Sequence, residues 1–373
     1  FVGFTPQLVL GIWVGMDDPS VSLGKDAWGT FHHITLPVLG PSIAAGAVLV
    51  ALYTLSDFGA VSLLRYETFT QAIFVNYTFF NQNLAAGFSL VLVLVAFGIL
   101  AIEATTRGRA RYYRNSAGSP RPAPPVQLGR WRWPALVFCT LVVLLALVLP
   151  MSILGYWVAR GLLVGEVLGT LWIPAVNSVF VSMLAAFATL LAAIPVTIMV
   201  VRFPGIVTWV LERLAYVGYA LPGIVVAIAL VFFGIKVVTP LYQTLGLLVF
   251  AYVILFLPLA IGALRASLLQ VSPRLEEAAR SLGQPYWKVL WRVTLPRIFP
   301  GVLAGGALVF LVTMKELPAT LIVSPLGFST LATSTWHAAE EAFFARASVL
   351  AFLLILASAP AVVLVMFLER RFR

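Results

Sequence analysis

Charge and cysteine are both scarce in this chain. Charged residues make up 10% of the 373 residues, whereas a soluble domain contains about 25%. Hydrophobic residues make up 61% of the chain, and the mean hydropathy is +1.01. The single cysteine, Cys139, excludes a disulfide framework and a cysteine-rich metal site. This composition predicts a polytopic membrane protein.

Three sequence signatures are also missing. The chain contains no Gly-x-x-x-x-Gly-Lys-Ser/Thr loop, so no residue suggests that this chain hydrolyses ATP itself. No segment interleaves aromatic and basic residues as nucleic-acid-binding proteins do, and we assign the net charge of +10 to cytoplasmic loops. The sequence begins at Phe1, and no signal peptide is visible in it. We therefore expect no cofactor and no nucleic acid on this chain, and we interpret it as a fragment or as lacking its true start.

Long apolar runs are what the sequence does contain. A membrane-spanning helix needs about 20 largely apolar residues, and we find eight such segments. Their approximate ranges are 40–60, 85–105, 134–156, 174–200, 213–234, 241–263, 300–322 and 347–368. We therefore predict an all-α membrane protein with about eight transmembrane helices.

The basic residues predict which loops face the cytoplasm. Seven arginines lie in residues 106–133 and six basic residues lie in 265–297, whereas the opposite loops contain few. The positive-inside rule places both segments in the cytoplasm, which agrees with eight spans and a cytoplasmic start. Residues 115–133 are rich in proline and arginine and are typical of a cytoplasmic linker. This linker separates residues 25–114, with two spans, from residues 134–373, with six.

A polar segment interrupts the apolar runs at residues 272–300. Ser272 and Pro273 are typical of a helix start, and Gly283 followed by Pro285 is typical of a helix end. A second amphipathic stretch follows. The pattern predicts a short helix–turn–helix on the cytoplasmic face, which either inserts into a groove of another protein or lies as a basic helix on lipid headgroups.

This polar segment has a degenerate copy 259 residues earlier in the chain. The first copy contains Leu23, Gly24, Leu36 and Pro37, which match Leu282, Gly283, Leu295 and Pro296. Such a repeat predicts a two-fold membrane protein that docks the same kind of partner twice. In the first copy, however, Pro19 and Ser20 replace the two alanines of the second copy and weaken the helix.

The second copy resembles the coupling-helix motif of type I ABC importer permeases, which is Glu-Ala-Ala, three residues, Gly and then a downstream Leu-Pro. The matching residues, together with the preceding acidic residue, are Glu276, Glu277, Ala278, Ala279, Gly283, Leu295 and Pro296. The resemblance covers about residues 25–373. It implies that this loop docks on a cytoplasmic ABC ATPase homodimer, and that a periplasmic or lipid-anchored binding protein delivers the solute. It also implies a multi-pass transporter subunit of the bacterial inner membrane rather than an enzyme.

Three segments resemble the ferric-iron branch of that family. These segments are residues 55–61, 315–320 and 330–333. The resemblance implies Fe(III) as the imported substrate, carried by an Fe(III)-binding protein. Thiamine, a polyamine or another small solute remains an open alternative.

Four residues are candidates for the translocation path. Asp57 and Glu316 occupy equivalent positions in the two copies, and an acid near a membrane span is a functional hypothesis by default. Fe(III) also favours oxygen ligands, although we favour a gating or structural role for both acids over metal contact. Pro222 and Gly223 interrupt an apolar span, and such breaks often line a substrate path. Close packing of helices through small residues predicts the same pattern.

Three polar residues on the last outer loop have a spacing that resembles a metal site. His337, Glu340 and Glu341 fall on one face of a helix. We favour contact with a delivering protein or with solvent for them, and we assign no metal site.

Residues 1–24 differ from the rest of the chain. They resemble a strand pair from the transpeptidase domain of class A penicillin-binding proteins. The catalytic Ser-x-x-Lys and Lys-Thr-Gly motifs of those enzymes are absent. We interpret residues 1–24 as a foreign or remnant segment that precedes a truncated first repeat. A membrane-anchored cell-envelope enzyme is the alternative of another class, and the missing motifs argue against it.

Overall fold

The computed structural model describes residues 32–33, 36–107, 129–165 and 171–371. Our expectations for residues 1–24, for Leu23 and Gly24, and for most of the linker 115–133 lie outside these ranges. Every regular element in the described part of the chain is a helix, which confirms the predicted all-α class. The chain divides into two compact units, which are residues 1–55 with 94–145, and residues 56–93 with 146–373.

The first unit contains helices that bury few side chains. Its described elements are α2 (Leu36–Ser56), the later part of α5 (Gln82–Arg107), η2 (Gly129–Trp131) and α6 (Arg132–Val143). Helix α6 buries none of its residues. It continues through a π-helical turn, η3 (Leu144–Val148), into α7 (Leu149–Val164) without interruption.

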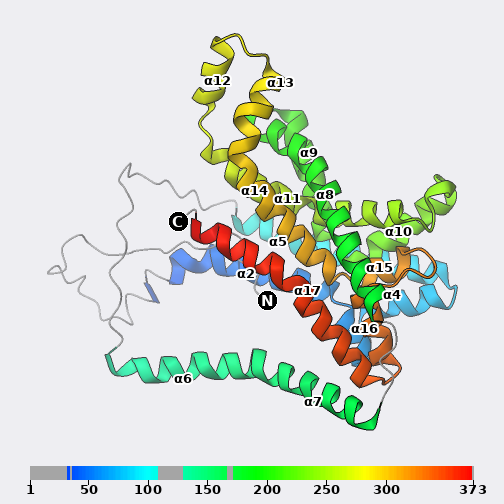
Figure 1. The fold of residues 1–373 in the computed structure, drawn as a ribbon. Helices are drawn as coiled ribbons and strands as arrows, with labels where there is room; N and C mark the ends of the chain where they lie inside the picture. The colour runs from blue at the N-terminus through cyan, green and yellow to red at the C-terminus, as the bar shows by residue number, and fades with distance from the viewer. Residues whose placement is uncertain (1–31, 34–35, 108–128, 166–170, 372–373) are drawn as a thin grey trace. The chain divides into compact units, whose positions relative to one another are not determined.

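The second unit is built around three long helices. These are α8 (Trp172–Arg202), α11 (Leu245–Gln270) and α14 (Leu295–Met314), which pack against one another (Figure 1). Helix α9 (Ile206–Ala220) packs on α11, and α17 (Phe344–Arg371) packs on α14. The core is rich in alanine and glycine because closely packed membrane helices need small residues where their backbones meet.

The helices reproduce the predicted apolar segments with three differences. Among the described residues, six helices are long and apolar enough to cross a membrane, and the segment in α2 counts only as a shorter apolar helix over Gly46–Ser56. The predicted span 213–234 is a pair of helices, α9 and α10 (Gly223–Lys236), bent by 106°. The break falls at Pro222, which has no backbone N–H to donate to the preceding turn. The predicted span 300–322 ends early, at Met314, and a separate short helix, α15 (Pro318–Val323), follows it.

The internal repeat is visible in the backbone of the second unit. Helices α3 (Gly59–Leu63) and α4 (Phe69–Thr78) correspond to α15 and α16 (Leu331–Glu340). Thr68 and Thr330 both cap the helix that follows them, through a side-chain oxygen that accepts a backbone N–H. Phe80 (φ 59°) and Ala342 (φ 64°) then both adopt left-handed backbone conformations.

The spacing of the repeat is not constant along the chain. Gly59 and Pro318 begin matching helices 259 residues apart. Thr68 and Thr330 cap matching helices 262 residues apart. The second copy therefore has three additional residues, one in α15 and two in the connection between its two short helices, which the constant offset of the sequence comparison did not predict.

The two copies also touch directly. The indole Nε1 of Trp336 donates to the hydroxyl of Ser62 at 2.8 Å. The rings of Phe58, Phe74 and Trp336 pack together, with centroids 4.9 to 5.9 Å apart. This aromatic cluster joins α3 and α4 to α16.

Candidate functional site

The most distinctive polar feature is a helical hairpin, residues 272–294, which we term the polar hairpin. It consists of α12 (Pro273–Ser281), α13 (Tyr286–Val289) and the π-helical turn η5 (Leu290–Thr294) (Figure 1). Pro273 lies in the first turn of α12, where its missing N–H is harmless. Gly283 has φ +80°, and its N–H donates to Arg280 O at 2.9 Å, which closes the helix. The predicted helix–turn–helix is therefore confirmed.

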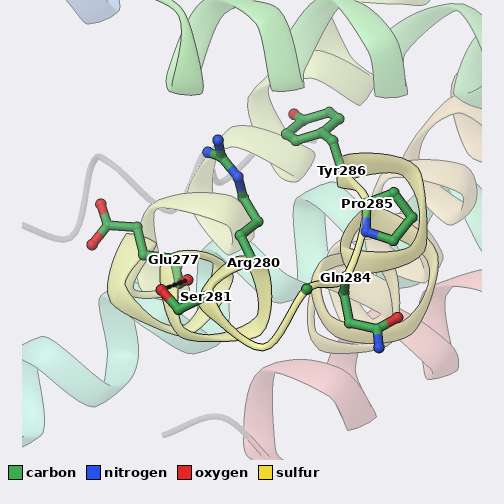
Figure 2. A pocket seen from close by; sticks show the side chains of 7 residues that line it. Glu277, Arg280, Ser281, Gln284, Pro285 and Tyr286 are labelled. Atoms are coloured by element: carbon green, nitrogen blue, oxygen red, sulfur yellow. Dashed lines mark hydrogen bonds between the residues drawn. The ribbon is translucent and has the colours of Figure 1, made fainter.

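The bend of the polar hairpin encloses an open recess. Its volume is about 690 Å³, and its lining residues are Glu277, Arg280, Ser281, Gly283, Gln284, Pro285 and Tyr286. Figure 2 shows the side chains of Arg280 and Tyr286, which come from the two helices, and Glu277 pointing away from them. The recess offers both charges and an aromatic ring to anything that enters it.

Apolar side chains are exposed on the polar hairpin. Leu282 is 82% exposed, Trp291 is 66% exposed and Trp287 is 60% exposed. Glu277 and Ala278 are also exposed, while Ala279 is partly buried. Large exposed apolar groups beside charged ones are typical of a protein–protein contact.

Glu276 differs from its neighbour Glu277, because its carboxylate points into the protein. One oxygen, Oε1, accepts hydrogen bonds from Arg202 Nη2 at 3.0 Å and from the Thr294 hydroxyl at 3.0 Å. The side chains of Arg202 and Glu276 are only 11% and 13% exposed. The structure therefore gives Glu276 internal partners, whereas we had placed it on the docking surface with Glu277.

A second ion pair lies between α11 and α9. Arg265 of α11 pairs with Glu212 of α9. Both side chains are partly exposed. This pair joins α9 to α11.

The structure brings together two of the predicted path residues, Glu316 and Gly223. A methyl group on Gly223 would lie 2.9 Å from Glu316 Oε1, so the carboxylate abuts the first residue of α10. The same oxygen accepts the N–H of Ala319, in the first turn of α15, at 3.3 Å. Glu316 thus lies at the N-terminal ends of two short helices, where the helix dipole favours a negative charge.

The other predicted path residues have different surroundings. Pro222 is the N-cap of α10 and marks the bend. Asp57 is half-buried, and its backbone carbonyl accepts a hydrogen bond from Thr70 at 2.7 Å. Its position before α3 matches that of Glu316 before α15, as the repeat predicted.

A pocket of about 350 Å³ lies between α4, α10, α15 and α16. Tyr77, Tyr242 and His337 contribute its main polar groups. Burial raises the pKa of the Tyr77 hydroxyl, and the neighbouring Tyr242 raises it further, so the phenol stays protonated at neutral pH. Within the described ranges, no three histidine, cysteine or carboxylate side chains form a metal-binding group, and this includes His337, Glu340 and Glu341.

The remaining predicted residues lie at helix starts. Leu295 and Pro296 form the first turn of α14 rather than a separate element. Leu36 and Pro37 likewise begin α2 in the first copy. The downstream Leu-Pro of the motif therefore marks the point where the polar loop passes into a membrane helix.

Sequence reasoning missed the residues that hold the polar hairpin in place. These are Arg202, Phe203, Thr294 and Tyr286. No local pattern could have revealed the Arg202–Glu276 pair, because the two residues are 74 positions apart. The one available signal was that a single arginine ends the apolar run of α8.

Comparison with known proteins gives matches over most of the chain. The family model described as "Binding-protein-dependent transport system inner membrane component" matches residues 193–373. The Fe(3+)-transport system permease protein FbpB 2 of Haemophilus influenzae is 37% identical over 352 residues. That match covers 92% of this chain and 69% of the relative.

Two other matches cover less. The molybdenum transport system permease protein ModB of Escherichia coli K12 is 38% identical over 73 residues, which are 20% of this chain and 32% of that protein. A crystal structure of a bacterial alginate ABC transporter with its periplasmic protein is 16% identical, with a TM-score of 0.48. That match covers 65% of this chain and 94% of the other.

Proposed function

Because this chain belongs to the family of binding-protein-dependent transport system inner membrane components, we propose that it is the membrane-spanning subunit of an ATP-driven importer for ferric iron. One observation carries the proposal. A permease named for Fe(3+) transport shares 37% identity with this chain over 92% of its length. The polar hairpin, which has the sequence features of a coupling loop, supports the same function.

The choice of substrate rests on the extent of the similarity. The match to the molybdenum permease is confined to 20% of the chain. It therefore indicates membership of the same family rather than the same transported substrate. The match to the ferric permease extends over both repeats, including residues 55–61 and 315–320. Glu316 and Asp57 offer carboxylate oxygens at equivalent places in the two copies, and hard Fe(III) favours such ligands.

We assign docking of the ATPase to the outward-facing part of the polar hairpin. Glu277, Ala278 and Gly283 are exposed, and Leu282 adds a largely exposed apolar side chain beside them. Ala279 is partly buried. Glu276, whose carboxylate is held by Arg202 and Thr294, fixes the orientation of α12 instead.

The partners follow from the family. A cytoplasmic ABC ATPase, which we propose to be a homodimer, hydrolyses ATP, since we assign no ATPase site to this chain. A periplasmic or lipid-anchored protein carrying Fe(III) delivers the substrate to the opposite face of a bacterial inner membrane. The bend at Pro222 and Gly223, with Glu316 beside it, is our candidate for the point where the path opens and closes.

The test is ATPase activity in liposomes that contain this chain and the ABC ATPase encoded nearest to its gene. We expect the Fe(III)-loaded binding protein to stimulate hydrolysis, and the same protein without iron to stimulate it less. Stimulation by a molybdate-loaded binding protein, but not by the Fe(III)-loaded one, would show that molybdate rather than Fe(III) is the substrate. Failure of the ATPase to co-purify would contradict the permease assignment.

One substitution tests the docking surface directly. Glu277→Lys reverses an exposed charge on the polar hairpin, so we expect stimulated hydrolysis to be abolished while the chain still inserts into membranes. Glu340→Lys, an equivalent reversal at an exposed residue of α16, is the matched control for the ATPase contact when co-purification of the ATPase is measured without the binding protein. Equal loss in both variants would argue against docking at Glu277.

A further inference from the structure

The inner end of α8 holds the polar hairpin at its base. Arg202, the last residue of α8, donates from Nη2 to the carbonyl of Val271 at 2.9 Å and to Glu276 Oε1 at 3.0 Å. Its Nε donates to the same carboxylate oxygen at 3.2 Å. One guanidinium therefore binds both the residue before the hairpin and the first turn of α12.

The far side of the hairpin joins the same cluster. Thr294, which is 3% exposed and ends the hairpin, donates its hydroxyl to Glu276 Oε1 at 3.0 Å. Phe203, the residue after Arg202, packs its ring on Tyr286 of α13 with centroids 5.9 Å apart. Two consecutive residues at the end of α8 thus contact both limbs of the hairpin.

The opposite end of α8 is bonded to a different element. The N–H of Leu331, the first residue of α16, donates to the hydroxyl of Ser178 at 2.6 Å. Asn177 donates from Nδ2 to the carbonyl of Ser329 at 3.0 Å. Ser178 is 1% exposed, so water does not compete for this contact.

Helix α8 is long enough to connect the two faces of the membrane. Its 31 residues run without interruption through Pro195 and extend about 46 Å at 1.5 Å per residue. The hydrocarbon core of a bilayer is about 30 Å thick. Ser178 and Arg202 are 24 residues apart, about 36 Å along the helix, so their contacts lie near opposite faces of that core.

We infer that Arg202 is a positioning residue for the polar hairpin, and that α8 links movement of this hairpin to the start of α16 on the opposite face. The inference rests on the proposed function, because the movement it describes is driven by an ATPase docked on the hairpin. The fork of the arginine is essential, since lysine offers a point charge that cannot hold Val271 and Glu276 in one plane. A purely stabilising ion pair is the competing explanation.

The first experiment separates positioning from stability. In liposomes with the ATPase and the iron-loaded binding protein, we expect Arg202→Lys to lower stimulation by about fivefold or more. Arg202→Gln leaves the Glu276 carboxylate without its counter-charge, whereas the double variant Arg202→Gln/Glu276→Gln leaves no unpaired charge. We expect the double variant to regain the unfolding midpoint of the wild type but not its stimulation. Recovery of both the unfolding midpoint and the stimulation in the double variant would show that the ion pair is purely stabilising, and would overturn the inference.

A matched control and a second readout make the result specific. Arg213→Gln removes one positive charge from α9, where the guanidinium packs on Trp209, and should leave stimulation unchanged.

Trypsin cleavage at Arg274 and Arg280 of the chain alone reports the placement of the hairpin without any transport. We expect faster cleavage in Arg202→Lys than in the wild type, and equal rates would contradict the positioning role. A wild type without stimulation would instead count against the proposed function.

The link through α8 has its own test, a double-mutant cycle between its two ends. Substitutions this far apart act additively when they are independent. We expect Arg202→Lys and Ser178→Ala to be non-additive in stimulation, because each breaks the same connection. Ser182→Ala is the control, since its buried hydroxyl makes no hydrogen bond. Additive effects of Arg202→Lys and Ser178→Ala would overturn the link.

Discussion

Two membrane spans of this chain have nearly the same hydropathy and opposite surroundings. The span over Gly129–Val164 has a mean hydropathy of 2.8, and none of the residues in its 18-residue apolar stretch is buried. Helix α11 has a mean hydropathy of 2.7, and 56% of the residues in its 18-residue apolar stretch are buried. Hydropathy therefore predicts that a segment crosses the membrane, but it does not predict whether the segment faces lipid or protein.

Small residues account for the difference between the two spans. In α14, a methyl group on Gly301 would lie 2.5 Å from Ser267 Cβ and 3.2 Å from the Ala263 carbonyl of α11. A methyl group on Gly305 would lie 3.3 Å from the Cβ of Ala263. In lipid, apolar surface alone does not drive helices together, so such close backbone approach determines which helices pack. The exposed span offers leucine, valine and phenylalanine to its surroundings instead.

The largest expected contrast comes from one substitution made in both spans. Leu264 of α11 is fully buried, so Leu264→Ala should lower the free energy of unfolding by about 2–5 kcal/mol. Leu141 of α6 is 51% exposed, and Leu141→Ala should change it by less than about 0.5 kcal/mol. Thermal unfolding in detergent measures both. Similar losses in the two variants would mean that α6 is packed as tightly as α11.

A smaller contrast tests the close approach itself. Gly301→Ala should lower stability by about 1–3 kcal/mol, because the added methyl group forces α14 away from α11. Gly155→Ala in α7 meets no atom within 4 Å and should stabilise the helix by about 0.5–1 kcal/mol. The two unfolding midpoints should thus move in opposite directions. If Gly301→Ala leaves the unfolding midpoint unchanged, close backbone approach between α14 and α11 is not the reason that α11 is buried.

The smallest contrast concerns a buried hydroxyl. Tyr252 of α11 is fully buried, and its hydroxyl lies 2.8 Å from Thr320 Oγ1. Since Thr320 donates its own proton to the Glu316 carbonyl, Tyr252 is the donor in this pair. Tyr252→Phe should therefore cost about 1 kcal/mol. Tyr156→Phe in the exposed span, where Tyr156 is 58% exposed, should be neutral in the same assay.

Much of the fold follows from the sequence because its signals are local. Apolar runs of sufficient length gave the spans, and Pro222 gave the bend between α9 and α10. Pro273 and Gly283 gave the limits of α12, since each has a backbone restriction that acts at its own position. The early end of the span before Glu316 was not predicted, because the apolar run continues through α15.

The candidate site was predicted less completely, because its geometry depends on residues far apart in the chain. Glu276 and Glu277 are adjacent and chemically identical, yet only Glu276 turns inward. What separates them is a one-residue rotation of about 100° around the helix, and a partner, Arg202, that comes from another span. The motif gave the position of the hairpin, whereas the roles of individual carboxylates required the folded chain.

The two additional residues between α15 and α16 have a consequence for recognition. Without them, the two copies would present connections of equal length. With residues 64–68 in one connection and 324–330 in the other, the two connections offer different surfaces. A protein that binds across both connections can then distinguish its two possible orientations, so a difference in loop length removes an ambiguity that the duplication created.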